Sequence, residues 1–422
     1  MTLQGAVGRQ GNIAGWPEVP FRAFLRRIEK AGNTDLPLLG VGLHEGVRRR
    51  NESDGRPAAS EDLSSYKLVR EGDVVMNRLG KPHGSVGVSP WRGITSPAYW
   101  VLEIDRSLAS PAFVHHLLRS SHLVREYERL GKYMPPNQFD ISWEAFRSIE
   151  VPLPPLEEQR RIADFLDAET AKIGSTVQKR LRQREILDEL ALSTTDAAIA
   201  ELSEVHWIRL GYLASIQSGV TVDGNREQDS STITMPYLRV ANVQADHIDL
   251  NQVAEISVSR RVAAASRLQV GDVLMTEGGD LDKLGRGTVW RGEIPDCLHQ
   301  NHVFAVRPNN RILTSEYLAL LTRASIARSY FESTGNKTTN LASTSSSKIR
   351  DFRVPLVDVS KQEYITEEVG SKNGSIAEAA GKMSRQLHLL TERRQALITA
   401  AVTGRVDVTA ERRLAEADGV DV

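Results

Sequence analysis

The last quarter of the chain carries an apolar residue at every seventh position. The line runs through Val369, Ile376, Met383, Leu390 and Leu397. Apolar residues at this spacing form the seam of a coiled coil, because a supercoiled helix presents the same face every seven residues. A helix that lies on its own globular domain favours a wider stripe with a period of 3.6 residues. The pattern therefore predicts a long helix that packs along another helix.

A second line of the same spacing lies about 200 residues earlier in the chain. It passes through Leu166, Ile173, Arg180, Leu187 and Thr194. We predict that the two helices pack on each other, and that the contact residues are Leu166, Ile173, Leu187, Val369, Ile376, Met383, Leu390 and Leu397.

The two helices are expected to begin differently. A run of prolines from Val151 to Leu156 sets an extended lead-in before the first helix. Ser360 and Glu363 have the spacing of a capping box, which satisfies free backbone N–H groups at a helix start. The sequence thus predicts a helix start close after Leu156 and another close to Ser360.

Short apolar stretches interrupted by Gly, Asp and Asn fill the region before each long helix. Such stretches are typical of strands and turns. Longer segments with helical spacing occur among them, from Phe113 to Tyr127 and from Tyr317 to Phe331. Each region therefore combines strands with at least one helix.

The two regions also match each other in sequence. Gly72-Asp-Val-Val-Met76 aligns with Gly271-Asp-Val-Leu-Met275, and Val151-Pro-Leu aligns with Val354-Pro-Leu. These and further matches keep their order at a nearly constant spacing, which indicates an internal duplication. We expect an α+β fold with a pseudo-twofold repeat, in which two similar globular domains are separated by two long antiparallel coiled-coil helices. The predicted parts are a first globular domain (1–152), a central helix (153–200), a second globular domain (201–356), a C-terminal helix (357–404) and a flexible tail (405–422).

The composition is that of an ordinary globular protein. Apolar residues make up 40% of the 422 residues and charged residues 25%, which argues against collagen-like and wholly disordered chains. No apolar run is long enough to span a bilayer, and the single cysteine, Cys297, suits a reducing compartment. We therefore expect a cytoplasmic location without membrane contact. The net charge of −1 argues mildly against a nucleic-acid partner, but an average charge permits a local basic face.

Two sequence segments resemble those of a known family. The segment Val151-Pro-Leu-Pro-Pro-Leu-Glu-Glu-Gln-Arg-Arg-Ile-Ala-Asp-Phe-Leu166 is similar to the central region of specificity subunits of type I restriction-modification enzymes. Arg394-Gln-Ala-Leu-Ile-Thr-Ala-Ala-Val-Thr-Gly404 supports the same resemblance, as does the glycine-rich segment from Thr276 to Gly287. The chain departs from the family pattern where Val-Asp-Val-Ser-Lys replaces the second proline-rich phrase, before Gln362.

The resemblance implies a non-catalytic subunit that binds double-stranded DNA. Each globular half would be a target recognition domain for one half of an interrupted, asymmetric DNA sequence. The helices would fix the gap between the half-sites and dock two methyltransferase subunits, which motor-nuclease subunits join. S-adenosylmethionine, ATP and Mg²⁺ would be held by these partners, with no cofactor in this chain.

Candidate DNA-binding residues follow from the chemistry of bases and phosphates. Arg and Lys bind guanine and phosphate, whereas Asn and Gln can bond adenine in two places. The donor-rich segments of the first half supply Arg48, Arg49, Arg50, Asn77, Arg78, Lys81, His83, Lys132, Tyr133, Asn137 and Gln138. Those of the second half supply Arg226, Lys283, Arg286, His299, Gln300, Asn301, His302, Asn336, Lys337, Thr338, Thr339 and Asn340.

The sequence contains no complete catalytic motif, which argues against an enzyme. Pro135-Pro-Asn-Gln-Phe139 contains the letters of an amino-methyltransferase loop in the wrong order, and no phosphate-binding loop is present. His299 and His302 lack a cysteine or carboxylate cluster that would complete a metal site. We expect no catalytic residue and no metal. Two alternatives stay open: a self-sufficient DNA methyltransferase or nuclease with an unrecognised active site, and a coiled-coil scaffold that does not touch DNA.

Overall fold

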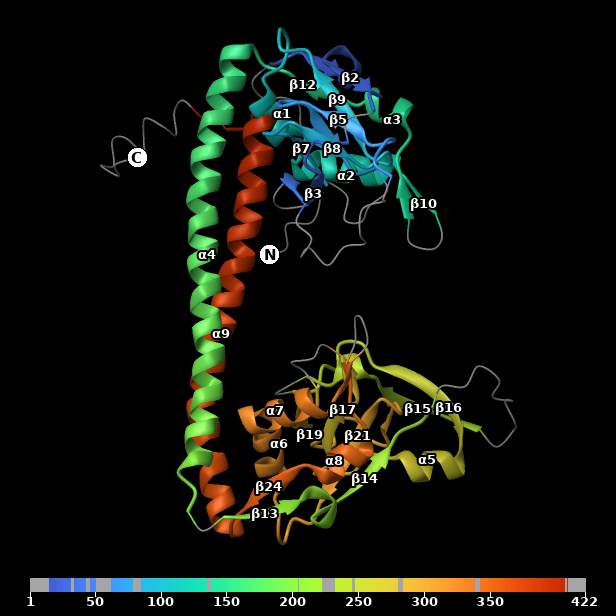
Figure 1. The fold of residues 1–422 in the computed structure, drawn as a ribbon, viewed down its shortest axis with the longest axis vertical. Coiled ribbons are helices and arrows are strands. Elements are labelled where there is room, and N and C mark those ends of the chain that lie inside the picture. The colour runs from blue at the N-terminus through green and yellow to red at the C-terminus, as the bar shows by residue number, and fades with distance from the viewer. Residues whose placement is uncertain are drawn as a thin grey trace. The chain divides into compact units, whose positions relative to one another are not determined.

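The computed structural model describes residues 15–31, 34–42, 46–50, 62–78, 85–134, 138–203, 205–221, 232–244, 247–279, 284–337, 342–406 and 408. The chain forms two compact units, which we call unit one (Met1–Arg180 and Arg385–Val422) and unit two (Leu181–Ser384). Helices α4 (Leu156–Ala200) and α9 (Val359–Val402) each contribute one part to each unit (Figure 1). The predicted domain boundaries stay predictions, since the units divide both long helices. Nowhere in the described residues is a helix both long enough and apolar enough to cross a membrane.

Unit one is a mixture of helices and antiparallel strands. Its central sheet has the order β2-β9-β6-β7, and Val75 of β6 lies opposite Val101 of β9. The elements are β1 (Glu18–Pro20), η1 (Phe21–Ala23), β2 (Leu25–Ile28), β3 (Leu39–Gly42), β4 (Gly46–Arg49), β5 (Lys67–Val69), β6 (Val74–Met76), β7 (Val86–Val88), β8 (Gly93–Thr95), β9 (Trp100–Ile104), α1 (Pro111–Leu118), α2 (Ser121–Leu130), β10 (Lys132–Met134), β11 (Gln138–Asp140), α3 (Trp143–Arg147) and β12 (Glu150–Pro152).

Unit two has a central sheet of the order β14-β21-β17-β19, again antiparallel. A further sheet, β16-β15-β20, covers a second core around Met235 and Tyr237. The elements are β13 (His206–Arg209), η2 (Leu210–Tyr212), β14 (Ala214–Ser218), β15 (Thr232–Leu238), η3 (Val240–Asn242), β16 (Ala254–Ser259), α5 (Arg260–Ser266), β17 (Val273–Thr276), β18 (Gly278–Gly279), β19 (Gly287–Val289), β20 (Leu298–His299), β21 (Val303–Pro308), α6 (Ser315–Arg323), α7 (Ser325–Thr334), β22 (Asn336–Lys337), β23 (Ala342–Ser343), α8 (Ser346–Asp351) and β24 (Arg353–Leu356). The α+β class predicted from the sequence is confirmed.

Each of the two segments with helical spacing forms two helices where the sequence predicted one. The segment from Phe113 to Tyr127 is divided into α1 and α2, because Ser120 adopts extended backbone and accepts a hydrogen bond from the N–H of Leu123. The segment from Tyr317 to Phe331 is divided into α6 and α7 at Ala324, which is also extended. The apolar spacing continued through both breaks, so periodicity alone did not reveal them.

The seventh-position lines lie on covered faces of the long helices. Leu166, Ile173 and Val369 are buried, and the other predicted packing residues, Leu187, Ile376, Met383, Leu390 and Leu397, are half-buried. A second covered line runs beside the first on α9, through Asn373, Ala380, Leu387, Arg394 and Ala401. Two lines spaced alternately by three and four residues are typical of a helix that packs along its length. The sequence analysis missed the second line because Asn373 and Arg394 are polar.

The helix parts in each unit share a core with the globular half. In unit one, Ile162 and Leu166 at the start of α4 lie in the same cluster as Ile398 and Val402 at the end of α9. Of the predicted tail, Arg405, Val406 and Val408 are described, and Val408 belongs to this cluster with 4% exposure. The flexibility expected for residues 405–422 stays a prediction, while the apolar side chain of Val408 is buried.

The predicted capping box at the start of α9 is also wrong. The helix begins at Val359, so Ser360 lies inside its first turn. The carboxylate of Asp358 accepts a hydrogen bond of 2.9 Å from the N–H of Lys361 and acts as the cap. Asp358 lies two residues before the predicted cap, Ser360. Its negative charge is also stabilised by the helix dipole at a helix start, which favours it as the cap.

A buried glutamine ties each long helix to the globular half before it. Gln159 in α4 donates to the carbonyl oxygens of Leu108 and Pro154, at 2.9 and 2.8 Å, and accepts from the N–H of Ser110 at 2.7 Å. Both Gln159 and its counterpart Gln362 are fully buried. The amide of Gln362 in α9 repeats the arrangement with the carbonyl oxygens of Ile312 and Val357 and the N–H of Thr314.

The other long helix makes a second attachment in each unit. In unit one, Thr399 of α9 accepts a hydrogen bond of 3.1 Å from the N–H of Ser121, where α2 begins. In unit two, the carboxylate of Asp196 in α4 accepts from the N–H and the hydroxyl of Ser325, where α7 begins. Each globular half is therefore held by one helix that follows it and by one that does not.

Replacing Gln362 with leucine should destabilise unit two. The change removes the side-chain partner of one backbone N–H and two carbonyl oxygens in a partly buried junction. A fully buried polar group left unpaired costs about 1–3 kcal/mol. We expect a loss of roughly 2–4 kcal/mol, allowing for relaxation. Chemical denaturation followed by tryptophan fluorescence and circular dichroism measures it. Gln386→Leu is the matched control, because Gln386 is exposed on the same helix; equal stability of the two variants would contradict the role given to Gln362.

Candidate nucleic-acid interface

The arginine run of unit one lies on strand β4. Arg49 is exposed and its guanidinium carbon lies 5.8 Å from the centre of the Trp91 ring, while Arg48 and Arg50 are half-buried. The N–H of Arg50 donates to the carbonyl oxygen of Leu38, which joins the run to the neighbouring segment. Arg49 is thus the most accessible of the three. Asn51 lies outside the described residues.

The second donor-rich segment follows strand β6. The N–H of Asn77, just after β6, donates to the carbonyl oxygen of Ser85, just before β7. The two ends of the segment between β6 and β7 therefore lie close together. Nη1 of Arg78 donates to both carboxylate oxygens of Asp140, at 2.8 and 3.0 Å. Arg78 is therefore held by another segment of unit one. Lys81 and His83 lie outside the described residues.

The third segment forms a hairpin that the sequence analysis had not predicted. Strands β10 and β11 are antiparallel, with Lys132 opposite Asp140 and Tyr133 opposite Phe139. Lys132 is exposed. Gln138 begins β11, and Asn137 lies outside the described residues. The hairpin therefore brings Lys132, Tyr133 and Gln138 together on two paired strands.

One predicted DNA-binding residue of unit two is a core residue. His299 is fully buried, and its Nδ1 donates to the carbonyl oxygen of Val303 at 2.6 Å. Burial lowers the pKa of His299, so the ring is neutral and unsuited to a phosphate. A side chain without exposed surface cannot reach a base edge, so the assignment of His299 is wrong. Both residues of β20, Leu298 and His299, are buried, so the strand lies entirely inside the core.

The residues after His299 are more accessible. Gln300 and Asn301 are half-buried, and Oε1 of Gln300 accepts from the N–H of Val240 at 3.4 Å. His302 is exposed and contacts the carboxylate of Glu277 through Nδ1. These three residues form a turn between β20 and β21, where a ligand could reach them.

The remaining candidates of unit two are only partly described. Arg286 is half-buried just before β19, and Asn336 is exposed on β22, where its side-chain oxygen accepts from Nζ of Lys348 at 3.0 Å. Lys337 also lies on β22. Arg226, Lys283, Thr338, Thr339 and Asn340 lie outside the described residues.

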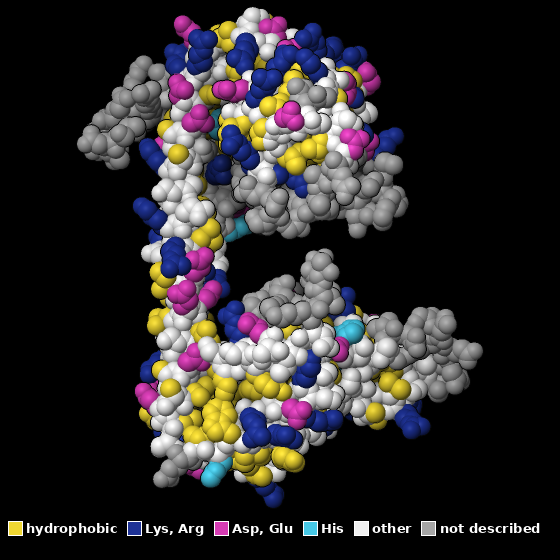
Figure 2. Space-filling view, viewed as in Figure 1, with side chains coloured by type: hydrophobic (Ala, Val, Ile, Leu, Met, Phe, Trp, Pro, Cys, Tyr) yellow, Lys and Arg dark blue, Asp and Glu magenta, His cyan; other side chains and the backbone are white. Residues whose placement is uncertain are grey.

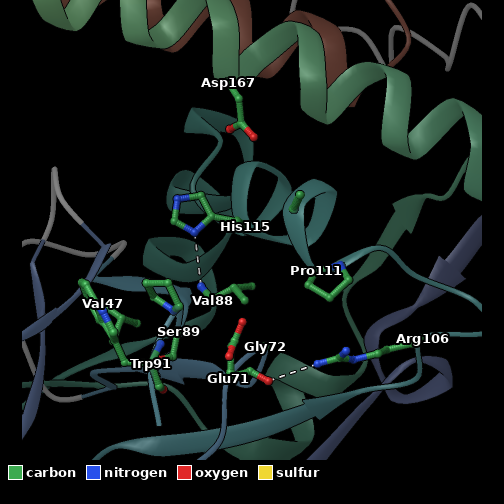
Figure 3. A pocket seen from close by; sticks show the side chains of 12 residues that line it. Val47, Glu71, Gly72, Val88, Ser89, Trp91, Arg106, Pro111, His115 and Asp167 are labelled. Atoms are coloured by element: carbon green, nitrogen blue, oxygen red, sulfur yellow. Dashed lines mark hydrogen bonds between the residues drawn. The ribbon is translucent and has the colours of Figure 1, made fainter. Parts of the chain in front are cut away.

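A cavity of about 760 Å³ lies in unit one between the globular half and helix α4 (Figure 3). Nδ1 of His115 accepts a hydrogen bond of 3.2 Å from the N–H of Val88, and Nη2 of Arg106 donates to the carbonyl oxygen of Glu71. Asp167 of α4 contacts Nε2 of His116 at 2.7 Å, and this hydrogen bond holds the pKa of Asp167 below its usual value. These contacts pair the polar groups with one another, which suits a structural junction better than a reaction centre.

No cluster of three or more His, Cys, Asp or Glu side chains in the described part of the chain has the arrangement of a metal site. The buried thiol of Cys297 has a pKa raised to about 12, chiefly by burial. A protonated, buried thiol is a weak nucleophile, so Cys297 is a packing residue.

Comparisons with known proteins agree with this reading of the residues. Residues 126–183 match the family model of the type I restriction modification DNA specificity domain. The chain is 24% identical over 275 residues to the type I restriction enzyme EcoKI specificity subunit of Escherichia coli, covering 61% of this chain and 57% of the relative. It is 20% identical over 187 residues to the MjaX type I restriction enzyme specificity subunit of Methanocaldococcus jannaschii, covering 44% and 42%. The matches thus span about half the length of these relatives.

A solved chain from work on complex assembly and conformational transition of the type I R-M system has a similar fold. Its TM-score is 0.63 at 19% identity, with 93% of this chain and 98% of that chain covered. The fold is therefore shared over nearly the whole length. Together the comparisons confirm the resemblance to type I restriction-modification specificity subunits that the sequence predicted.

The stability of unit one should fall in mild acid because of His115. Burial and, to a smaller extent, the nearby charge of Arg119 lower the pKa of His115 from an ordinary value of 6.5 to about 3. The neutral ring's contribution is complete above pH 6.5. It is lost as the pH falls from 6.5 towards 3, by up to about 1.4 kcal/mol per pH unit, because only the unfolded chain takes up the proton.

Thermal unfolding at several pH values between 7.5 and 4 tests this expectation. His115→Gln should show a weaker loss of stability in acid than the wild type. His388→Gln is the control, since His388 is 73% exposed on α9. Identical pH dependence of the wild type and His115→Gln would argue against the buried neutral ring.

Proposed function

We propose that this chain is the specificity subunit of a type I restriction-modification complex and reads a bipartite, asymmetric DNA target. The observation that carries the proposal is the repeated attachment of a globular half to both long helices. Gln159 and Gln362 make the same three hydrogen bonds, Thr399 binds the start of α2, and Asp196 binds the start of α7. Two similar halves on one helical support suit the reading of two separated half-sites.

The proposed parts keep the boundaries predicted from the sequence. Residues 1–152 and 201–356 act as target recognition domains, and residues 153–200 and 357–404 act as spacer helices in an antiparallel coiled coil. Helix α4 has 45 residues, which corresponds to about 65 Å at about 1.5 Å per residue. The matching central sheets of the two units support a pseudo-twofold internal repeat. The proposed contacts differ between the halves, which supports an asymmetric target.

DNA contact is proposed for the accessible candidates. In unit one these are Arg49 and Lys132, both exposed, and in unit two His302 and Asn336. Arg and Lys side chains position a protein on phosphates, whereas the amide of Asn can read a base edge. Lys and Arg are interspersed with Asp and Glu over the visible surface, in line with the near-zero net charge (Figure 2). The partners are therefore proposed to supply part of the phosphate binding.

Methyltransferase docking is proposed for the long helices. Figure 2 shows hydrophobic side chains at their surface, and Leu181, Ile186 and Leu190 of α4 are 41–49% exposed, while Leu389 of α9 is 60% exposed. Exposed apolar side chains on a helix suit contact with another protein. Two methyltransferase subunits and the motor-nuclease subunits would hold S-adenosylmethionine, ATP and Mg²⁺. This chain would supply no catalytic group and would act in the cytoplasm.

Co-expression with the partner methyltransferase tests the proposal. The complex should methylate adenines in one interrupted motif, and genome-wide methylation mapping identifies that motif. A continuous motif would contradict the two-reader arrangement. Methylation or cleavage by the purified chain alone would favour a self-sufficient enzyme instead.

Exchange of one globular half gives a separate prediction. Replacing residues 1–152 with the matching segment of a homologue should change one half of the methylated motif and leave the other half and the gap intact. The physical reason is that each half contributes its own donor-rich segments, whereas the helices set the spacing. A change in both halves would contradict the assignment of one half-site to each unit.

A further inference from the structure

Arg78 is fixed between the core of unit one and the β10–β11 hairpin. Its Nη1 donates to both carboxylate oxygens of Asp140, at 2.8 and 3.0 Å. Its guanidinium carbon lies 6.0 Å from the centre of the Trp100 ring, and Trp100 is 3% exposed. The side chains of Arg78 and Asp140 retain 33% and 31% exposure. The ion pair is therefore a partly desolvated bridge from the sheet to the hairpin.

Asp140 occupies a position where its charge matters. It ends strand β11 and lies directly opposite Lys132, the exposed lysine at the start of β10. Residues opposite each other in an antiparallel pair point to the same face of the strands. The positive charge of Arg78 offsets the negative charge of the Asp140 carboxylate. The positive charge of Lys132 is then the one that remains at this end of the hairpin.

Unit two holds its corresponding hairpin by the main chain. Strand β23 pairs with β22 in the hairpin and also with β18, with Gly278 opposite Ser343. The carbonyl oxygen of Glu277 accepts a further hydrogen bond of 2.7 Å from the N–H of Thr344. Among the described residues of unit one, β10 and β11 form a two-stranded sheet, and the Arg78–Asp140 ion pair joins this sheet to the segment after β6.

We propose that the Arg78–Asp140 ion pair positions the β10–β11 hairpin for reading the half-site of unit one. The proposal rests on the proposed function and corrects the role given to Arg78, which becomes a positioning residue and not a DNA contact. Lys132, Tyr133 and Gln138 are the residues that the pair places. In this proposal two charged side chains set the orientation of the hairpin in unit one, whereas the described contact of β23 with β18 in unit two is made by backbone hydrogen bonds.

Electrostatics separates this role from direct contact. If Arg78 bound a phosphate, Arg78→Ala would weaken DNA binding and Asp140→Ala would strengthen it, because the first removes a positive charge and the second a negative one. Loss of a phosphate contact also lowers the slope of log affinity against log salt by about 0.9. If the pair positions the hairpin, both changes impair recognition of the same half-site.

The experiment uses the full chain in complex with its methyltransferase subunits. Methylation rates are measured on the mapped target and on two targets, each with one half-site altered, and DNA affinity is measured across a salt series. Arg78→Ala and Asp140→Ala should each reduce discrimination at one half-site at least tenfold and leave discrimination at the other half-site unchanged. The exchanged variant, Arg78→Asp with Asp140→Arg, should restore at least part of the lost discrimination, because it rebuilds the pair.

A matched control tests the same chemistry elsewhere in unit one. Arg26 and Glu103 form an ion pair between β2 and β9, and Arg26 is 80% exposed. Arg26→Ala should leave discrimination at both half-sites unchanged. Thermal unfolding and assembly with the methyltransferase subunits confirm that each variant is folded, and Arg78→Lys, which keeps the charge, provides a milder change.

The outcomes distinguish this inference from the proposed function. Wild-type discrimination by Asp140→Ala, or a salt slope lowered by about 0.9 in Arg78→Ala together with tighter binding by Asp140→Ala, would overturn the positioning role alone. Failure of the wild-type complex to methylate any interrupted target would overturn the proposed function and, with it, this inference.

Discussion

The fold depends on a glutamine side chain in the first turns of each long helix. A buried amide has two N–H groups and one oxygen to satisfy, and leaving any of them unpaired is costly. Gln159 and Gln362 meet this demand with two backbone carbonyl oxygens and one backbone N–H each. These partners lie at the start of a globular helix and in the lead-in to the long helix. The amide therefore fixes the angle at which the helix leaves the globular half.

The two units share these attachments to the long helices but differ in their interiors. Asp272 of unit two is fully buried and receives hydrogen bonds of 2.7 and 2.8 Å from the guanidinium of Arg307. Asp73, its counterpart in unit one, accepts a backbone hydrogen bond from Arg70, and burial raises its pKa. Both aspartates accept a hydrogen bond from the backbone N–H three residues earlier, and an ion pair is added to this bond only at Asp272 among the two. Differences of this kind leave the attachments of the globular halves to the long helices unchanged, while the polar contacts inside the two units differ.

The hairpins show the same divergence at the surface. In unit two a backbone ladder continues from β18 through β23 to β22, and in unit one the described link between the hairpin and the segment after β6 is the Arg78–Asp140 ion pair. Backbone hydrogen bonds tolerate changes of side chain, whereas an ion pair is lost with either partner. The proposed DNA-reading hairpin of unit one is therefore sensitive to two particular side chains, whereas β23 of unit two is held to β18 by its backbone.

The sequence by itself determined the α+β class, the family resemblance and the seventh-position lines on two long helices, because hydrophobic periodicity and short motifs are local properties. The spacing that aligns Val151-Pro-Leu with Val354-Pro-Leu also aligns Gln159 with Gln362. The sequence did not reveal the role of these glutamines, since two of the three partners of each lie about 50 residues away in the chain. Only the tertiary structure decided that His299 is buried, that Arg78 meets Asp140, and that α1 and α2 are separate helices. Each of these depends on which face of a strand meets the core or on contacts between distant segments. The physical reason is that burial and pairing are fixed by packing in three dimensions, which the local pattern of side chains does not contain.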